Sequence, residues 1–270
     1  MSPEWETICR DVRVGVEEAL AGLPTREERE LSHGIGAGGD ETAAVDAVAE
    51  AVVLERLAAL HADGHEFSLV SEEAGERRYG RSPTWRLVVD PIDGSANAKR
   101  GLPHFAISIA VAEGPTIGDV VYGYVFDLAA REEWTAIRGG GARLDGHLLG
   151  PERPRDSLEI VALEATRTRS LARVLPSLVG RCERVRVFGS LALSLCHLAA
   201  ARVDGACSLQ AIRSVDIAAA QLIALESGIS VALPDRASLA GAPLDLERRS
   251  RLIASGSPAN VEALAEAISA

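Results

Sequence analysis

The sequence predicts an α/β fold made of two unlike halves. Three β-like runs, FAISIAVA, DVVYGYVF and EEWTAI, occupy residues 105–137 and are separated by short turns, which indicates an antiparallel meander. Beyond about residue 155, strand-like and helix-like runs alternate, a pattern typical of α/β layers. A chain of 270 residues can form one large domain or two subdomains. We therefore predict an N-terminal α+β subdomain at 1–155 and a C-terminal α/β subdomain at 156–270.

The first seventy residues predict two helices and a short strand. Apolar positions recur at helical spacing over residues 3–22, which indicates an amphipathic helix. A second amphipathic helix is expected at 40–60, with Asp40 as its N-cap. The run at 67–71 is β-like and ends in a pair of acids.

A glycine-rich stretch lies between the two helices, at residues 34–39. It formally matches the dinucleotide-binding pattern G-x-G-x-x-G, but no apolar strand precedes it and no second strand closes on a suitable acid about 20 residues later. We interpret it as a loop, either simply flexible or able to close over a nearby site.

The C-terminal half predicts nine elements in alternation. Strand-like runs there are short and apolar, and each helix-like run begins or ends at a recognisable capping or breaking residue. The expected order is a strand at 158–164, a helix at 169–179, a strand at 184–188, a helix from 190, a strand at 206–209, a helix from about 215, strands at 229–233 and 251–255, and a helix from 257.

Composition argues against nucleic acid and membranes as partners. The formal net charge is −11, whereas both of those partners select basic surfaces. No apolar run reaches the roughly 18 residues that a membrane-spanning helix needs, and the acidic N-terminus is unlike an export signal. The four cysteines are scattered without a C-x-x-C pair, so we expect reduced thiols in a cytoplasmic protein.

Chemistry is indicated first by residues 88–101, which are VVDPIDGSANAKRG. Asp90 and Asp93 follow an apolar strand-like run, and Pro91 and Gly94 force the chain to turn there. Two carboxylates crowded into one turn repel each other unless a cation or proton intervenes. Oxygen ligands suit a hard ion, so we predict a magnesium site, and the alternative is a plain polar turn.

The residues after this turn favour an anion. Residues 94–97 offer consecutive backbone amides and a hydroxyl, and a helix beginning there would attract phosphate. Because the chain is acidic overall, bound metal would have to supply the local positive charge. A second acidic pair, Glu72 and Glu73, also ends a strand-like run, and neighbouring strands could bring the two acidic ends together.

These motifs together resemble the inositol monophosphatase superfamily, which also contains fructose-1,6-bisphosphatases and 3′-phosphonucleotide phosphatases. The segments SEE at 71–73, DPIDGS at 90–95 and VDIAA at 215–219 resemble its three motifs in family order. The glycine-rich loop and NAKRG are similar to the archaeal-type branch. The resemblance implies a layered α-β-α-β-α sandwich, a homodimer and two or three magnesium ions.

The resemblance also implies a role for each matching residue. The implied metal ligands are Glu72, Asp90, Asp93, Asp216 and the main-chain carbonyl of Ile92. The implied catalytic residues are Glu72, Asp46 and Ser95, the last two of which would orient the attacking water and accept its proton. Phosphate would contact Gly94 and Ser95, and the rest of the substrate would contact Gly189 and Ser190.

Substrate selection is where the sequence departs from inositol-type members. Residues 207–215 contain no acid to bind sugar hydroxyls, and they contain Gln210 and Arg213 instead. Arginine suits bidentate contact with a second phosphate or a carboxylate, although Arg213 could equally be solvated.

The function expected from all of this is magnesium-dependent hydrolysis of a small sugar, polyol or nucleoside phosphate by activated water. One alternative is a 3′-phosphonucleotide or bisphosphate phosphatase of a dedicated biosynthetic pathway. Another is a catalytically silent homologue that binds metal.

Overall fold

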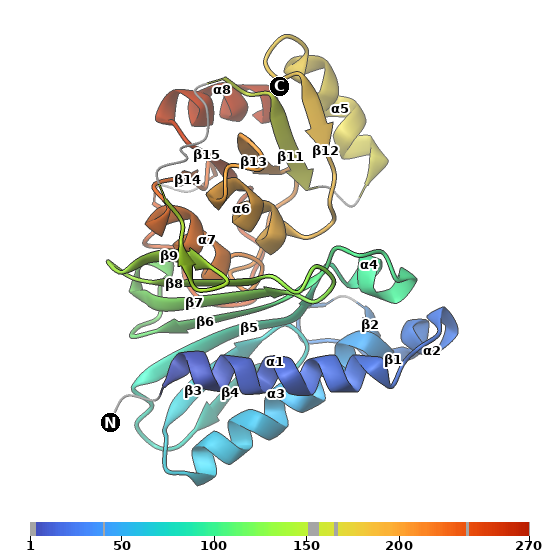
Figure 1. Cartoon of the computed structure of the whole chain (residues 1–270), viewed down its shortest axis with the longest axis vertical. Coiled ribbons are helices and arrows are strands. Elements are labelled where there is room, and N and C mark those ends of the chain that lie inside the picture. The colour runs from blue at the N-terminus through green and yellow to red at the C-terminus, as the bar shows by residue number, and fades with distance from the viewer. Residues whose placement is uncertain (1–3, 40, 151–156, 165–166, 236–237, 270) are drawn as a thin grey trace.

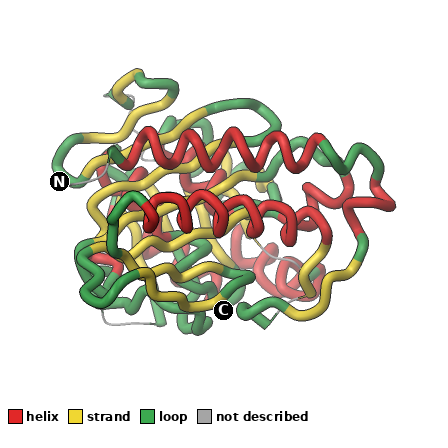
Figure 2. Tube along the Cα trace, turned by 90° about the horizontal axis from the view of Figure 1, so that it is seen from below, coloured by secondary structure: helices red, strands yellow, loops and turns green. Residues whose placement is uncertain are grey.

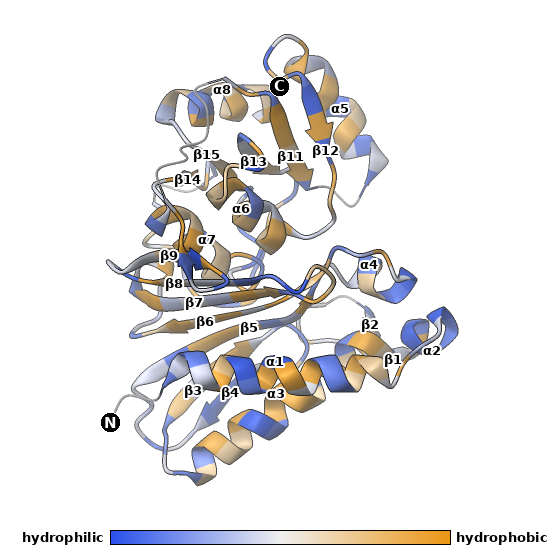
Figure 3. Ribbon diagram, in the orientation of Figure 1, coloured by the Kyte–Doolittle hydropathy of each residue, from blue (hydrophilic) through white to orange (hydrophobic). Residues whose placement is uncertain are grey.

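Five layers make up the computed structural model, which describes residues 4–39, 41–150, 157–164, 167–235 and 238–269. From bottom to top in Figure 1 these are a helix pair, a large sheet, a second helix pair, a smaller sheet and an outer helix pair. Figure 3 shows hydrophobic residues gathered on the strands and on the helix faces turned toward them. The predicted layered α/β fold is confirmed.

The first layer consists of α1 (Trp5–Ala21) and α3 (Ala44–Ala62), which lie side by side across the large sheet (Figure 2). Each helix carries an apolar stripe against the strands, and burial of such a stripe is the main source of helix stability. Both helices were predicted from their periodicity. The proposed cap Asp40 lies outside the described residues, and the N-cap of α3 is Ala43.

The large sheet has eight strands in the order β10-β9-β8-β7-β6-β5-β3-β4. Its pairs are antiparallel except for β3 with β5, which is parallel. The meander predicted over 105–137 is confirmed as β6, β7 and β8. The bounds are β3 (Phe67–Ser71), β4 (Gly75–Tyr79), β5 (Trp85–Asp93), β6 (Ala106–Ala112), β7 (Val120–Asp127), β8 (Glu133–Ile137), β9 (Gly141–Leu144) and β10 (His147–Leu148).

The middle layer consists of α6 (Leu191–Ala199) and α7 (Ala218–Glu226), which lie between the two sheets. Both helices are apolar on nearly every side because each is covered from two directions. Close approach is made possible by glycine at Gly123 of β7, where an added Cβ would lie 2.7 Å from the carbonyl oxygen of Ala219.

The smaller sheet has five strands in the order β12-β11-β13-β15-β14, with β12, β11 and β13 parallel and the remaining pairs antiparallel. Its outer face is covered by α5 (Thr168–Leu178) and α8 (Pro258–Ser269). The predicted alternation is therefore confirmed. The strand bounds are β11 (Ile160–Glu164), β12 (Arg184–Arg186), β13 (Gly205–Ser208), β14 (Ser230–Ala232) and β15 (Ile253–Ser255).

Several short elements escaped prediction because they are polar. Strand β4 reads GERRY, with its charged residues exposed at the edge of the sheet, and all five residues of α2 are charged. A capping box between Thr25 and Glu28 was nevertheless a readable signal for α2. The remaining short elements are α2 (Arg26–Glu30), β1 (Ser32–Ile35), β2 (Glu41–Ala43), α4 (Ser95–Arg100) and the 3-10 helix η1 (Ile117–Asp119).

The predicted subdomain boundary falls among residues 151–156, outside the described residues. The core of the middle layer contains residues from both sides of that point, such as Val125 and Trp134 with Leu195 and Leu222. The division at residue 155 stays a prediction.

The contact between β7 and α7 provides a stability test. We expect Gly123→Ala to lower the free energy of unfolding by about 1–3 kcal/mol, because the added methyl group would force β7 and α7 apart. Urea unfolding followed by circular dichroism measures this change. Gly150→Ala is the control, since a Cβ there meets no atom within 4 Å. Equal stability of the two variants would contradict the prediction.

Candidate active site

Three acids from separate segments meet at one end of the large sheet. Strands β3 and β5 are parallel neighbours in which Ser71 pairs with Val89, so Glu72, directly after β3, lies beside Asp90 near the end of β5. The turn before α7 brings Asp216 to the same place. Carboxylate oxygens of Glu72, Asp90 and Asp216 all lie within 4.8 Å of one another. The predicted convergence of these acids, which we call the acidic cluster, is present.

The turn that follows Asp90 is fixed by its own backbone. The Oδ1 atom of Asp90 accepts a hydrogen bond from the Ile92 amide at 3.1 Å, and the Ser95 hydroxyl donates to the Ile92 carbonyl at 3.0 Å. Gly94 has a φ of 95°, a left-handed conformation that favours glycine. A Cβ there would also lie 3.1 Å from the carbonyl oxygens of Gly189 and His104, so this position needs glycine for two reasons.

Electrostatics make the acidic cluster unfavourable without a counter-charge. Burial, reinforced by neighbouring carboxylates, raises the pKa of Asp90 well above its usual range. Burial also raises the pKa of Glu72 to about 7, although Arg213 opposes the shift. Clustered carboxylate oxygens are the donors that magnesium prefers, and a divalent ion would relieve both the repulsion and the desolvation. Glu72, Asp90 and Asp216 therefore fit the predicted metal.

Asp93 faces the N-terminus of α6. Its Oδ2 atom accepts hydrogen bonds from the Ser190 hydroxyl at 2.5 Å and from the Ala192 amide at 2.7 Å. Burial raises the pKa of Asp93 to about 7 against these hydrogen bonds, which lower it. Asp93 thus connects the DPIDG turn to the predicted substrate-binding residue Ser190, and its role as a metal ligand stays a prediction.

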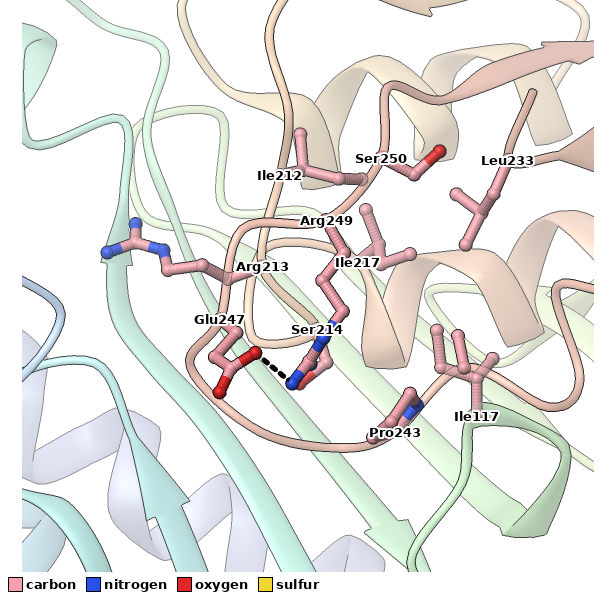
Figure 4. A pocket seen from close by; sticks show the side chains of 11 residues that line it. Ile117, Ile212, Arg213, Ser214, Ile217, Leu233, Pro243, Glu247, Arg249 and Ser250 are labelled. Carbon is pink, nitrogen blue, oxygen red and sulfur yellow. Dashed lines mark hydrogen bonds and ion pairs between the residues drawn. The ribbon is translucent and has the colours of Figure 1, made fainter. Parts of the chain in front are cut away.

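Arg213 belongs to the acidic cluster. Its side chain is only 7% exposed, and Nη2 lies 2.6 Å from Glu72 Oε1 and 3.1 Å from Asp216 Oδ1. The turn before α7 also lines a mainly apolar pocket. Figure 4 shows that the Arg213 side chain points away from the other residues that line this pocket. The alternative that Arg213 is solvated is therefore wrong. Its proposed contact with substrate stays a prediction.

Asp46 and Ser95 lie together, as the resemblance implied. Asp46 is buried in the first turn of α3, where its Oδ2 atom accepts from the Ala43 amide at 3.1 Å. Burial raises the pKa of Asp46, while hydrogen bonding with Ser95 lowers it. Lys99 places its Nζ 4.0 Å from Asp46 Oδ2. A carboxylate beside a hydroxyl can accept a proton relayed through that hydroxyl.

The glycine-rich loop lies over the acidic cluster. The amide of Gly38 donates to the Glu72 carbonyl at 2.8 Å, and the amide of Ala37 donates to the Glu73 carbonyl at 3.1 Å. A Cβ on Gly38 would lie 2.4 Å from Arg213 Nη1. The loop is therefore near the site as predicted, and its ability to open stays a prediction.

Two residues around Gly189 and Ser190 were missed from the sequence. Glu164 accepts the Gly189 amide proton at 2.8 Å, and Asn97 donates through Nδ2 to the Phe188 carbonyl at 2.7 Å. A signal for Glu164 existed, because it ends a strand-like run as Glu72 does. Nothing in the sequence indicated the partner of Asn97.

Comparison with known proteins gives this geometry a family. The sequence model of the protein family described as "Inositol monophosphatase family" matches residues 12–270 of this chain. The chain belongs to the inositol monophosphatase family. As the sequence predicted, it is a phosphatase of the kind that hydrolyses small phosphate esters.

Relatives in this family carry different names. A "Fructose-1,6-bisphosphatase/inositol-1-monophosphatase" from Methanothermobacter thermautotrophicus is 32% identical over 262 residues, which is 93% of this chain and 92% of the relative. The "Nus factor SuhB" of Escherichia coli is 35% identical over 191 residues, which is 68% of each chain.

The solved structures agree with the fold. A crystal structure described as an inositol monophosphatase–fructose 1,6-bisphosphatase superposes with a TM-score of 0.84 at 25% identity, covering 98% of this chain and 100% of the other. Within the described residues, no helix combines the length and apolar character needed to cross a bilayer. All four cysteines are free thiols, as predicted.

Repulsion within the acidic cluster can be tested by stability. In EDTA we expect Asp90→Asn to raise the free energy of unfolding by about 1–2 kcal/mol, because the substitution removes one carboxylate from a cluster of carboxylates that repel one another. With magnesium chloride the wild-type melting temperature should rise, and that of the variant should rise less. Differential scanning fluorimetry in both buffers measures the two effects.

Asp127→Asn is the control for this experiment. Asp127 is also a buried carboxylate, but its Oδ1 atom accepts the amide protons of Ala129 and Ala130 outside the acidic cluster. That variant should lose stability in both buffers and keep the response to magnesium. An equal magnesium response of the Asp90 variant and the wild type would contradict the prediction.

Proposed function

We propose that this chain hydrolyses a small phosphorylated sugar, polyol or nucleoside with magnesium held by Glu72, Asp90 and Asp216. The observation that carries the proposal is the meeting of these three carboxylates, with oxygen atoms within 4.8 Å of one another and Asp90 buried. We further propose that Asp93 and the Ile92 carbonyl complete the ligand set for two or three ions. Bound magnesium would supply neutralisation of phosphoryl charge and a lowered pKa of water.

The protein's own groups would do the remaining work. The first amides of α4, at Gly94 and Ser95, would bind phosphate oxygens. The Ser95 hydroxyl would orient the attacking water, and Asp46, whose pKa the neighbouring Ser95 hydroxyl lowers, would take the proton of that water through the hydroxyl. Gly189 and Ser190 would form the wall that contacts the rest of the substrate.

The surroundings of the enzyme are also proposals. The net charge of −11 argues against nucleic acid as a partner, and it means that a small phosphorylated substrate would have to be held by local cations. We propose a homodimer in the cytoplasm. Sedimentation equilibrium tests the homodimer, and fractionation of cells that express the chain tests the cytoplasmic location.

Two alternative functions each have a specific observation in their favour. The name of the Methanothermobacter relative includes a bisphosphatase activity, and Arg213 could bind a second anionic group, so a bisphosphate substrate is the first candidate. The name of the Escherichia coli relative describes a Nus factor, so a role without catalysis is the second candidate. Retention of all four motif acids here favours an enzyme over that role.

Magnesium dependence and Ser95 provide the primary test. We expect phosphate release from a panel of sugar, polyol and nucleoside phosphates in magnesium, and none in EDTA. Ser95→Ala should lower kcat by roughly a hundredfold, because the water loses its orienting hydroxyl. Ser95→Thr keeps the hydroxyl and should keep activity within a few-fold of the wild type. Activity that is indifferent to chelator would reject the proposed function.

Arg213 tests the choice between mono- and bisphosphate substrates. Arg213→Ala should raise KM for bisphosphates by roughly tenfold relative to monophosphates if the guanidinium contacts a second anion, since charged hydrogen bonds are worth about 1.5–3 kcal/mol. Steady-state kinetics on paired substrates measures the difference. Arg249→Ala is the control, because Arg249 comes from the neighbouring loop and pairs with Asp245 and Glu247. An equal effect of Arg213→Ala on both substrate classes would contradict the second anion contact.

A further inference from the structure

Glu164 is a buried acid that the proposed mechanism does not use. It ends β11 in the smaller sheet, and only 9% of its surface is exposed. Burying a carboxylate carries a large desolvation cost unless hydrogen bonds to the charged form offset it. The hydrogen-bond donors to Glu164 therefore indicate which part of the structure its carboxylate stabilises.

Both oxygens of Glu164 bind the start of α6. Oε2 accepts the Gly189 amide proton at 2.8 Å, while Oε1 accepts the Ser194 hydroxyl at 2.6 Å and the Phe188 amide at 3.3 Å. All the donors lie in the turn and first helical residues that carry Ser190. A glutamine of the same size would direct an NH₂ group at one of these donors, so the geometry specifies a carboxylate.

The same turn is held from the opposite side by the DPIDG segment and α4. Asp93 accepts from the Ser190 hydroxyl at 2.5 Å, and Asn97 donates to the Phe188 carbonyl at 2.7 Å and to the His104 carbonyl at 2.7 Å. The turn is therefore fixed between Glu164 in one half of the chain and Asp93 in the other.

We propose that Glu164 is a positioning residue for the active site. By holding the amides at 188–189 and the Ser194 hydroxyl, it sets the direction in which Ser190 meets Asp93. The orientation of the Asp93 carboxylate, and of the substrate wall at Gly189, depends on that contact. This inference rests on the proposed function, because its consequence is tighter binding of divalent ions and substrate.

The test compares Glu164→Gln with a matched variant at Asp204, which precedes β13 and binds backbone amides at the opposite end of β11. Asp204 is 8% exposed, and its Oδ2 atom accepts the amides of Glu159 and Ile160 at 2.9 and 2.8 Å. Asp204→Asn therefore removes an equivalent buried charge that holds backbone amides far from Ser190. Both variants should lower the melting temperature, which accounts for a purely structural contribution.

Only Glu164→Gln should change the site. We expect it to raise the Kd for Mg²⁺, measured by isothermal titration calorimetry on the full chain, by roughly tenfold, and KM for a phosphomonoester by a similar factor. Asp204→Asn should leave both quantities within twofold of the wild type. If Glu164→Gln lowers the melting temperature as Asp204→Asn does and leaves the Kd unchanged, the proposal is overturned.

Ser194→Ala keeps the proposal testable if Glu164→Gln does not fold. It removes one donor to Oε1 and keeps the carboxylate, so the Kd for Mg²⁺ should rise by a smaller factor in the same direction. An unchanged Kd in that variant would overturn the proposal. A wild-type chain that binds no Mg²⁺ and releases no phosphate would instead contradict the proposed function itself.

Discussion

Repulsion among clustered carboxylates constrains the whole molecule. Glu72 follows β3, Asp90 lies in β5 and Asp216 lies in the turn before α7, and their carboxylates meet at one site where Asp90 is buried and the other two are half-buried. Such a cluster opposes folding unless a cation joins it, and the layered core must offset that opposition. Arg213 supplies one internal positive charge to two of the three acids. The site thus sacrifices stability for a place where a divalent ion is strongly favoured.

A second dependence runs through the start of α6. Asp93 from the large sheet and Glu164 from the smaller sheet bind donors in the same few residues, and Ser190 lies between them. Hydrogen bonds to ionised groups are strong and directional. Those of Asp93 and Glu164 therefore fix the two sheets relative to each other beside Ser190. The position of the smaller sheet therefore affects the orientation of Asp93. The DPIDGS motif alone does not show this dependence.

The sequence determined some of this and left the rest open for physical reasons. Acids at the ends of two strand-like runs predict convergence, because parallel neighbours end at the same edge of a sheet. The direction of a long side chain is not local information, so the sequence could not decide between a solvated Arg213 and one bound to acids. Strand β4 was missed because its charged residues suit an exposed edge as well as a loop. Glu164 ends a strand-like run, but its contacts could not be predicted because its donors lie 24 to 30 residues further along the chain.

Local positive charge resolves an apparent conflict between an acidic protein and an anionic substrate. The chain has a net charge of −11, which repels phosphate at long range, yet salt screens such repulsion beyond about 8–10 Å. Lys99, the only lysine in the sequence, lies beside Asp46, and Arg213 lies beside Glu72. These two cations together with divalent ions would supply the positive charge that attracts the phosphate. Capture of the substrate then depends on the site's own charges, and the overall charge serves mainly solubility.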